Sequence, residues 1–413
     1  MKINSLLFFF SLSFLILFVS LLEINYLISS QPSPSLSTKS SSTSGTTKLQ
    51  STTIISTSSF LEYQQQFTDW MIQNNKSYTN NEFLTRFHIF IDNLLYVNQF
   101  NSLTGNDTDA MRLGMNVFAD LTLDEFANTF LVKDLSNFSL NSNTTTSTTS
   151  STTTTTGGGL LGGLLTRVLA IGTGGSTSGG GGGGLLGGLL TCSSQPSKSS
   201  LRTLMAVTVD WRSYLPPVKK QGSCGSCYAF GPLAQLETAL AIKGQRVSLS
   251  EQEIVDCTSS YGNKGCSGGW MTKVYNYISD AGGVSSESSY PYKGVVQQCK
   301  PVGTKYGIVV NKVTLFDQSG IENALTNVGP VAVALQANVR SFQMYKSGVY
   351  YDDTCGAGPI DHIVALVGMG EESGKQYYIV RNSWGTGWGE GGYMRMVRTT
   401  RRVNDQGYYL TIQ

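Results

Sequence analysis

The stretch Gln221-Gly-Ser-Cys-Gly-Ser-Cys-Tyr-Ala-Phe230 places a cysteine, Cys227, in a turn of small residues, six positions after the amide-bearing Gln221. One of the two histidines of the chain, His362, follows 135 residues later. Twenty residues after that histidine comes the motif Asn382-Ser-Trp-Gly385. A cysteine nucleophile, a distant histidine and an asparagine that orients the histidine form the constellation of a thiol protease.

Each of these residue types has a chemical role in such a site. A thiolate is the nucleophile, and a free cysteine is mostly protonated at neutral or acid pH. A helix N-terminus and a nearby imidazolium both favour the thiolate, and the Ala- and Leu-rich residues 228–242 predict a helix that starts at Cys227. His362 would hold the proton and return it to the leaving amine, while Asn382 fixes the ring. The Gln221 side chain and the Cys227 backbone N–H would donate to the oxyanion.

Other interpretations of these residues lead to different functions. Cys224 and Cys227 have the spacing of a redox pair or of half a zinc site. Zinc needs further ligands at short spacing, and neither a second Cys-x-x-Cys nor a histidine stands near this segment. A lone histidine before an apolar run is most often a packed core residue, but the spacing of His362 to Cys227 and Asn382 favours the catalytic interpretation. We therefore expect no metal and no other cofactor.

These motifs, in this order and spacing, resemble the papain-like cysteine proteases. The resemblance extends over residues 207–407 and includes Val209-Asp-Trp-Arg212 and Gly265-Cys-Ser-Gly-Gly269. It implies an α+β fold of two lobes, in which a helical lobe carries the nucleophile and a β-barrel-like lobe carries the histidine and the asparagine. The cleft between the lobes would bind an extended peptide. The family usually has tryptophan directly after the nucleophile, where this chain has Tyr228, and we expect a change of packing without loss of activity.

By the same resemblance, an extended substrate would pair with the backbone of Gly268 and Gly269. The pocket for the substrate residue two places before the cut bond would be lined by four apolar side chains, which are Trp270, Met271, Ala334 and Ile363. They predict a bulky hydrophobic substrate residue there. The other substrate-binding positions are Asp361 and Trp384. Ile363 stands where the family commonly has alanine, so we expect a shallower pocket.

A second match lies upstream, where six residues with spacings of 4, 4, 3, 4 and 4 share one stripe of a predicted helix. They are Glu82, Arg86, Phe90, Asn93, Val97 and Asn101. Glu82 and Arg86 are expected to form a favourable i,i+4 ion pair. Taken alone, the stripe also fits an ordinary amphipathic helix with incidental charges. It resembles the inhibitory prodomain of cathepsin-L-like proteases, and Gly114-Met-Asn-Val-Phe-Ala-Asp120 matches the second motif of that prodomain. Such a prodomain lies across the cleft and blocks it until it is cleaved.

The rest of the chain is typical of a secreted precursor. An uncharged apolar run over residues 6–22 predicts a signal peptide, with a signal anchor as the alternative. Glycosylation is predicted at four Asn-x-Ser/Thr sequons, which are Asn75, Asn106, Asn137 and Asn143. The expected organisation is a signal peptide or anchor over 1–30, a Ser/Thr-rich linker over 31–58, the inhibitory prodomain over 59–135, a Thr- and Gly-rich linker over 136–202 and the protease domain over 203–413.

The chain has seven cysteines. The disulfides that the resemblance implies are Cys224 with Cys266 and Cys257 with Cys299. Both would lie in the helical lobe, which fits an oxidising compartment, and Cys227 must stay free to react. Cys355 occupies one half of a third bridge of the family, but no cysteine stands at the usual partner position near Gln406. Cys355 is therefore either a free thiol or paired outside the family pattern, and Cys192 in the linker is the remaining candidate partner.

The net charge of +2 gives no reason to expect a nucleic-acid partner. The complete catalytic set favours an active cysteine endopeptidase, made as a zymogen and working in lysosomes or outside the cell. A non-catalytic binding protein on the same fold and an exopeptidase are the alternatives, although an exopeptidase needs an element that blocks one end of the cleft. We expect a monomer whose partners are protein and peptide substrates, its own prodomain and cystatin-like inhibitors. Membrane contact is expected only if the N-terminal segment remains as an anchor.

Overall fold

The computed structural model describes residues 57–105, 110–132, 135, 208–300, 303–315, 317–352, 358–398 and 407–412. All of them belong to one compact unit, Thr57–Gln413. The predicted signal or anchor segment, the Thr- and Gly-rich linker, Cys192, Cys355 and three of the four sequons lie outside the described residues. The remaining sequon residue, Asn75, is exposed. Within the described part of the chain, no helix is both long and apolar enough to cross a membrane.

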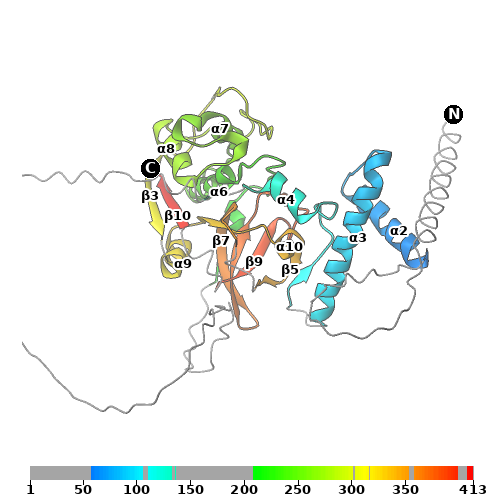
Figure 1. Cartoon of the computed structure of the whole chain (residues 1–413). Helices are drawn as coiled ribbons and strands as arrows, with labels where there is room; N and C mark the ends of the chain where they lie inside the picture. Colours follow the sequence, from blue (N-terminus) through cyan, green and yellow to red (C-terminus); the bar gives the residue numbers. More distant parts are fainter. Residues whose placement is uncertain are drawn as a thin grey trace, which may run out of the picture. The chain divides into compact units, whose positions relative to one another are not determined.

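The N-terminal part of this unit is helical (Figure 1). Helix α2 spans Thr57–Gln73, α3 spans Asn80–Leu103 and the shorter α4 spans Leu123–Phe130. Aromatic side chains fill the space between α2 and α3, and the ring centroids of Phe67 and Phe90 lie 5.1 Å apart. Aromatic pairs at this separation stabilise a core beyond the area that they bury.

The predicted stripe of α3 holds the segment that carries the second prodomain motif. Asn93 is buried and donates to the carbonyl oxygens of Ala119 at 2.9 Å and Leu121 at 3.0 Å. Asn101 exchanges two hydrogen bonds with the backbone of Leu113, each 3.0 Å long. The two motifs are therefore parts of one hydrogen-bonded structure, since the side-chain amides of the first bind the backbone around the second.

The ion pair expected between Glu82 and Arg86 is not the one that the structure contains. The Glu82 carboxylate accepts hydrogen bonds from the backbone N–H and hydroxyl of Thr79, at the start of α3. The Arg86 guanidinium instead reaches Glu125 of α4 at 2.8 Å and also donates to the carbonyl oxygen of Asp120. The expectation was wrong because the helix start and a tertiary partner both compete with a local i,i+4 contact.

The C-terminal part of the unit contains a helical lobe built on α6, Cys227–Ile242. Most residues of α6 are buried, as expected of a helix that is apolar on all sides. Helices α7 (Glu251–Cys257) and α8 (Met271–Asp280) pack against it. Both disulfides that the resemblance implies are present here, Cys224–Cys266 and Cys257–Cys299, and Cys227 is free.

The second lobe is a sheet in which the described strands follow the order β3-β10-β4-β7-β8-β9-β6, with β2 paired to β7. The strand bounds are β2 Val209–Asp210, β3 Val309–Leu315, β4 Val331–Leu335, β6 Val349–Tyr350, β7 His362–Glu372, β8 Lys375–Arg381, β9 Tyr393–Val397 and β10 Gly407–Ile412. Two helices complete this lobe, α9 at Gln318–Asn327 and α10 at Arg340–Gln343. All strand pairs of this sheet are antiparallel except β6 with β9.

The two lobes meet where α6 lies against β7 (Figure 1). Gly231 allows this approach, because a Cβ atom there would lie only 3.0 Å from Cγ2 of Ile363. Nine residues of β7, from His362 onward, are buried, as expected of a strand covered on both faces. The structure is therefore the expected α+β fold of two lobes. Cys227 and His362 are each the first residue of the element that faces the other lobe.

Candidate active site

Cys227 is completely buried at the start of α6. Burial raises the pKa of its thiol to about 12, against the opposing hydrogen bond from the Ile363 backbone. The negative charge of Asp361 also raises this pKa. In this covered form the sulfur is therefore a neutral thiol at physiological pH, which is a poor nucleophile.

His362 is held by the amide side chain of Asn382. The His362 Nε2 and Asn382 Oδ1 atoms are 2.8 Å apart, and the same oxygen accepts the backbone N–H of Ser383 at 2.8 Å. Since Oδ1 is the acceptor in both contacts, Nε2 carries the imidazole hydrogen and Nδ1 is the basic nitrogen. Nδ1 has no hydrogen-bond partner among the described residues. Burial lowers the pKa of His362 to about 4, so the ring is neutral here.

The indole of Trp384 stacks on the imidazole, with ring centroids 4.7 Å apart and an interplanar angle of 25°. Two aromatic side chains of the N-terminal part cover the indole in turn. Phe118 and Phe126 contact it edge to face, at centroid distances of 5.4 Å and 5.1 Å. Phe342 and Trp388 of the second lobe also contact the indole, so Trp384 is buried between aromatic side chains of both parts and covers the imidazole that bonds to Asn382.

Gln221 donates its side-chain amide to the carbonyl oxygen of Phe130, the last residue of α4, at 3.0 Å. The same amide group donates to the carbonyl oxygen of Cys224 at 3.0 Å. Its own oxygen accepts from the hydroxyl of Ser383 at 2.6 Å, which orients the amide. The candidate oxyanion donor thus already holds a peptide carbonyl.

Sequence reasoning missed Ser383. Its backbone N–H orients Asn382 and its hydroxyl orients Gln221, so it contacts both side chains that flank the candidate nucleophile and base. The only signal available in the sequence was its position directly after Asn382.

The segment that follows α4 continues across the candidate cleft. Backbone N–H groups of Val132 and Leu135 donate to the carbonyl oxygens of Asp361 and Ile360, each at 2.9 Å. The Val132 side chain lies against Gly268, where an added Cβ would come within 2.7 Å of it. The cleft therefore holds Val132 and Leu135 by backbone hydrogen bonds, and Val132 also by its contact with Gly268.

The predicted pocket residues fall into one apolar cluster. Leu135 is fully buried in this cluster, and the pocket residues that share it are Trp270, Met271, Ala334 and Ile363. Trp270 directs its indole N–H to the hydroxyl of Tyr408 at 3.3 Å. Asp361 uses its backbone carbonyl in the cleft, whereas its carboxylate accepts the backbone N–H groups of Ala337 and Asn338.

Two comparisons identify the family. The model described as papain family cysteine protease matches residues 205–410, and the model of the cathepsin propeptide inhibitor domain matches residues 67–126. Cysteine proteinase 3 of Dictyostelium discoideum is 38% identical over 347 residues, which cover 82% of this chain and 87% of that protein. The chain belongs to the papain family of cysteine proteases.

Solved structures agree with this assignment. Digestive procathepsin L 3 from the larval midgut of Tenebrio molitor is 30% identical and covers 84% of this chain and 99% of its own, with a TM-score of 0.63. The ragweed pollen allergen Amb a 11, a cysteine protease in its proform, is 27% identical and covers 85% of this chain and 95% of its own, with a TM-score of 0.64. As a papain-family member, the chain is a cysteine-type peptidase that carries an inhibitory propeptide domain.

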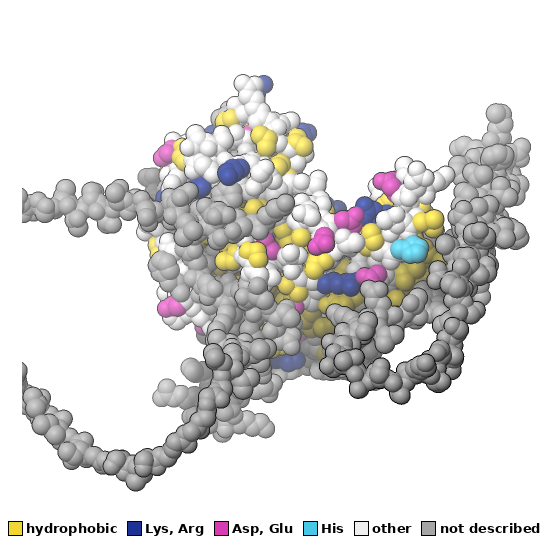
Figure 2. Space-filling view, in the orientation of Figure 1, with side chains coloured by type: hydrophobic (Ala, Val, Ile, Leu, Met, Phe, Trp, Pro, Cys, Tyr) yellow, Lys and Arg dark blue, Asp and Glu magenta, His cyan; other side chains and the backbone are white. Residues whose placement is uncertain are grey.

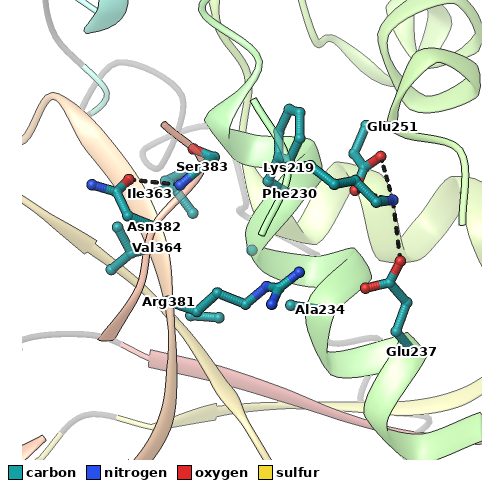
Figure 3. A pocket seen from close by; sticks show the side chains of 12 residues that line it. Lys219, Phe230, Ala234, Glu237, Glu251, Ile363, Val364, Arg381, Asn382 and Ser383 are labelled. Carbon is teal, nitrogen blue, oxygen red and sulfur yellow. Dashed lines mark hydrogen bonds and ion pairs between the residues drawn. The ribbon is translucent and has the colours of Figure 1, made fainter. Parts of the chain in front are cut away.

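A small cavity in this papain-family fold is bordered by Lys219, Arg381 and Asn382 (Figure 3). Its volume of about 10 Å³ admits no more than about one water molecule, so it is not a substrate site. Lys219 makes ion pairs there with Glu251 at 2.8 Å and Glu237 at 3.2 Å. Burial raises the pKa of Glu251 to about 7, against the opposing charge of Lys219.

Among the described residues, no group of three His, Cys, Asp or Glu side chains could hold a metal ion.

A polar contact joins the propeptide domain to the protease domain at Arg340 of α10. Its guanidinium donates to Oδ1 of Asn93 at 2.8 Å and to Oδ2 of Asp92 at 2.5 Å, and it lies 4.5 Å from the ring centroid of Tyr96. The space-filling view has basic and acidic side chains next to one another over the region of α3 and α4 (Figure 2). The propeptide strand β1 (Arg112–Leu113) also pairs with β5 (Tyr345–Ser347).

Proposed function

We propose that this papain-family zymogen is an endopeptidase whose catalytic centre consists of Cys227, His362, Asn382 and Gln221. One observation carries the proposal. The Gln221 amide donates to the carbonyl oxygen of Phe130 and to that of Cys224, in the turn that leads to Cys227. The contact with Phe130 supports a site built to hold the oxygen of a peptide bond beside a thiol.

The proposed mechanism begins when the propeptide leaves. The pKa shifts of Cys227 and His362 are caused mainly by burial, so the return of solvent favours transfer of the thiol proton to Nδ1 of His362. The thiolate then attacks the substrate carbonyl carbon, and Gln221 Nε2 and the Cys227 backbone N–H donate to the resulting oxyanion. His362 gives its proton to the leaving amine. Water finally hydrolyses the thioester and restores the thiol, with Asn382 orienting the ring in every step.

The path of the propeptide supports an endopeptidase in place of an exopeptidase. Phe126 of α4 lies against Trp384 of the lobe that carries His362, and Val132 lies against Gly268 of the lobe that carries Cys227. The propeptide thus contacts both lobes along its path, and this supports a cleft without a blocking element. By the family resemblance, Gly268 contacts substrate residues before the cut bond, so the propeptide runs opposite to a substrate and is not presented for cleavage.

The apolar cluster around Leu135 supports a preference for a bulky hydrophobic residue two places before the cut bond. We also propose the domain limits of 59–135 for the inhibitory prodomain and 203–413 for the protease, after a signal peptide. Action in the lysosome or outside the cell follows from that signal and from the two disulfides, which need an oxidising compartment.

The test is active-site labelling of the acid-processed protein with an epoxysuccinyl thiol-protease inhibitor, read by peptide mass mapping. Turnover of fluorogenic Phe-Arg and Arg-Arg substrates is measured on the same samples. We expect one adduct on Cys227, loss of turnover in proportion to labelling, and a higher kcat/KM for the substrate with Phe two places before the cut bond. Processed, folded protein with neither label nor turnover would favour a non-catalytic binding protein. Preference for Arg at that position would overturn the pocket assignment.

A further inference from the structure

Tyr228 directly follows the candidate nucleophile in α6 and is fully buried. Its hydroxyl donates to the backbone carbonyl oxygen of Gly265 at 3.0 Å. Gly265 begins the loop 265–269, which ends at the two glycines assigned to the substrate backbone. The side chain after the nucleophile is therefore tied to the start of this loop.

The ring of Tyr228 also supports the end of the loop. A Cβ atom added to Gly269 would lie 2.9 Å from Cδ2 of Tyr228 and 2.5 Å from Oδ1 of Asn263, so the backbone there lies directly on the ring. The middle of the loop is held separately, by the Cys224–Cys266 disulfide and by a hydrogen bond from Gly225 to the carbonyl oxygen of Cys266. Tyr228 thus contacts both ends of a loop whose centre is covalently fixed.

The opposite surface of this loop faces the cleft. Gly268 has a φ of 105° and lies against Val132 of the propeptide, with 2.7 Å between an added Cβ and the nearest methyl carbon. A displacement of the loop by a few tenths of an ångström would change the width of the cleft at this position. The same displacement would leave the positions of His362 and Asn382 unchanged, because both residues belong to the other lobe.

We propose that Tyr228 is a positioning residue for substrate binding, whose hydroxyl sets the place of loop 265–269 in the cleft. This inference rests on the proposed function, because it assigns the loop to the substrate backbone. Tyr228 does not touch the reacting atoms in this assignment. Its loss therefore weakens the binding of extended peptides and leaves the reactivity of Cys227 unchanged.

The experiment compares Tyr228→Phe with the parent after processing of the full-length chain. Tyr275→Phe is the matched control, because Tyr275 is also fully buried in the helical lobe and its hydroxyl donates to the Gln235 side chain, away from the loop. Active-site titration counts competent molecules. We expect Tyr228→Phe to raise KM for an extended peptide about threefold to tenfold, the loss of roughly one hydrogen bond, with kcat within about twofold. Alkylation of Cys227 by iodoacetamide, which needs no loop contact, stays within about twofold of the parent.

Three outcomes would overturn the inference while the parent is active. They are an unchanged KM in Tyr228→Phe, an equal rise of KM in Tyr275→Phe, and a parallel fall of kcat and of the alkylation rate. If Tyr228→Phe does not fold, Tyr228→Met keeps a buried apolar side chain of adaptable shape without a hydrogen-bond donor. An unchanged KM in that variant also overturns the inference. An inactive parent would instead contradict the proposed function, so the two failures are distinguishable.

Discussion

Replacing Arg340 by alanine should loosen the propeptide without touching the candidate catalytic residues. Arg340 lies on the protease side of the contact, and its guanidinium is the group that binds Asn93, Asp92 and the face of Tyr96. Asn93 is only 2% exposed, so its Oδ1 loses charged hydrogen bonds in a buried place.

The expected loss follows from these contacts. A hydrogen bond to a charged group contributes about 1.5–3 kcal/mol and a partly exposed cation–π contact about 0.5–1 kcal/mol. The ion pair adds little, because the Asp92 side chain is 75% exposed and exposed pairs contribute about 0.2–1 kcal/mol. Since the Arg340 side chain is itself 27% exposed, we expect a net loss of about 2 kcal/mol. That corresponds to an open form about 30-fold more populated.

The assay measures how fast iodoacetamide alkylates Cys227 in the intact zymogen at neutral pH, by peptide mapping. Cys227 is fully buried, so the rate follows the population of the open form when opening is fast relative to alkylation. Arg246→Ala is the matched control, because Arg246 donates to the Ser213 carbonyl and lies over Tyr214 within the protease domain. Alkylation of Arg340→Ala at the parent rate, or an equal acceleration in Arg246→Ala, would refute the reasoning.

Three further outcomes follow from the site and the propeptide. Asn382→Ala removes the acceptor for Nε2 of His362, so kcat of the processed enzyme should fall about a hundredfold with little change in KM. An unchanged kcat would contradict the proposed role of Asn382 in orienting the His362 ring. Desolvation alone would raise the pKa of Glu125, but hydrogen bonds at the start of α4 and from Arg86 lower it. The Glu125 carboxylate therefore stabilises the folded zymogen above its ordinary pKa of 4.5, and this stabilisation is lost as pH falls through the lowered pKa. Glu125→Gln should therefore melt with a weaker acid dependence below pH 4.5 than the parent zymogen, and identical acid profiles would exclude this contribution. Val132→Asp places a carboxylate in a buried position of the cleft and should weaken the closed form of the zymogen by about 2–4 kcal/mol. Cys227 should then be alkylated more than tenfold faster than in the parent. A rate equal to that of the parent would show that this segment does not close the cleft.

Local chemistry was readable directly from the chain. The residue types and spacing of Cys227, His362 and Asn382 are sufficient for the family resemblance, and the apolar run after Cys227 is sufficient for a buried helix. The stripe on α3 was recognisable because helical periodicity is a local property. Such features depend on residues close in the chain or on motifs that a family repeats.

Contacts between distant residues were not readable in this way. Arg340 is hydrogen-bonded to Asn93, which is 247 positions away in the chain, and Arg86 pairs with Glu125 instead of the nearby Glu82. These partners depend on which surfaces the packed helices bring together. The neutral state of Cys227 has the same origin, since burial in the folded protein is the main cause of its raised pKa. The sequence therefore specified the reacting groups. Tertiary packing determined their protonation, their burial and the side chains that orient them, because desolvation and hydrogen-bond geometry exist only once distant segments are in contact.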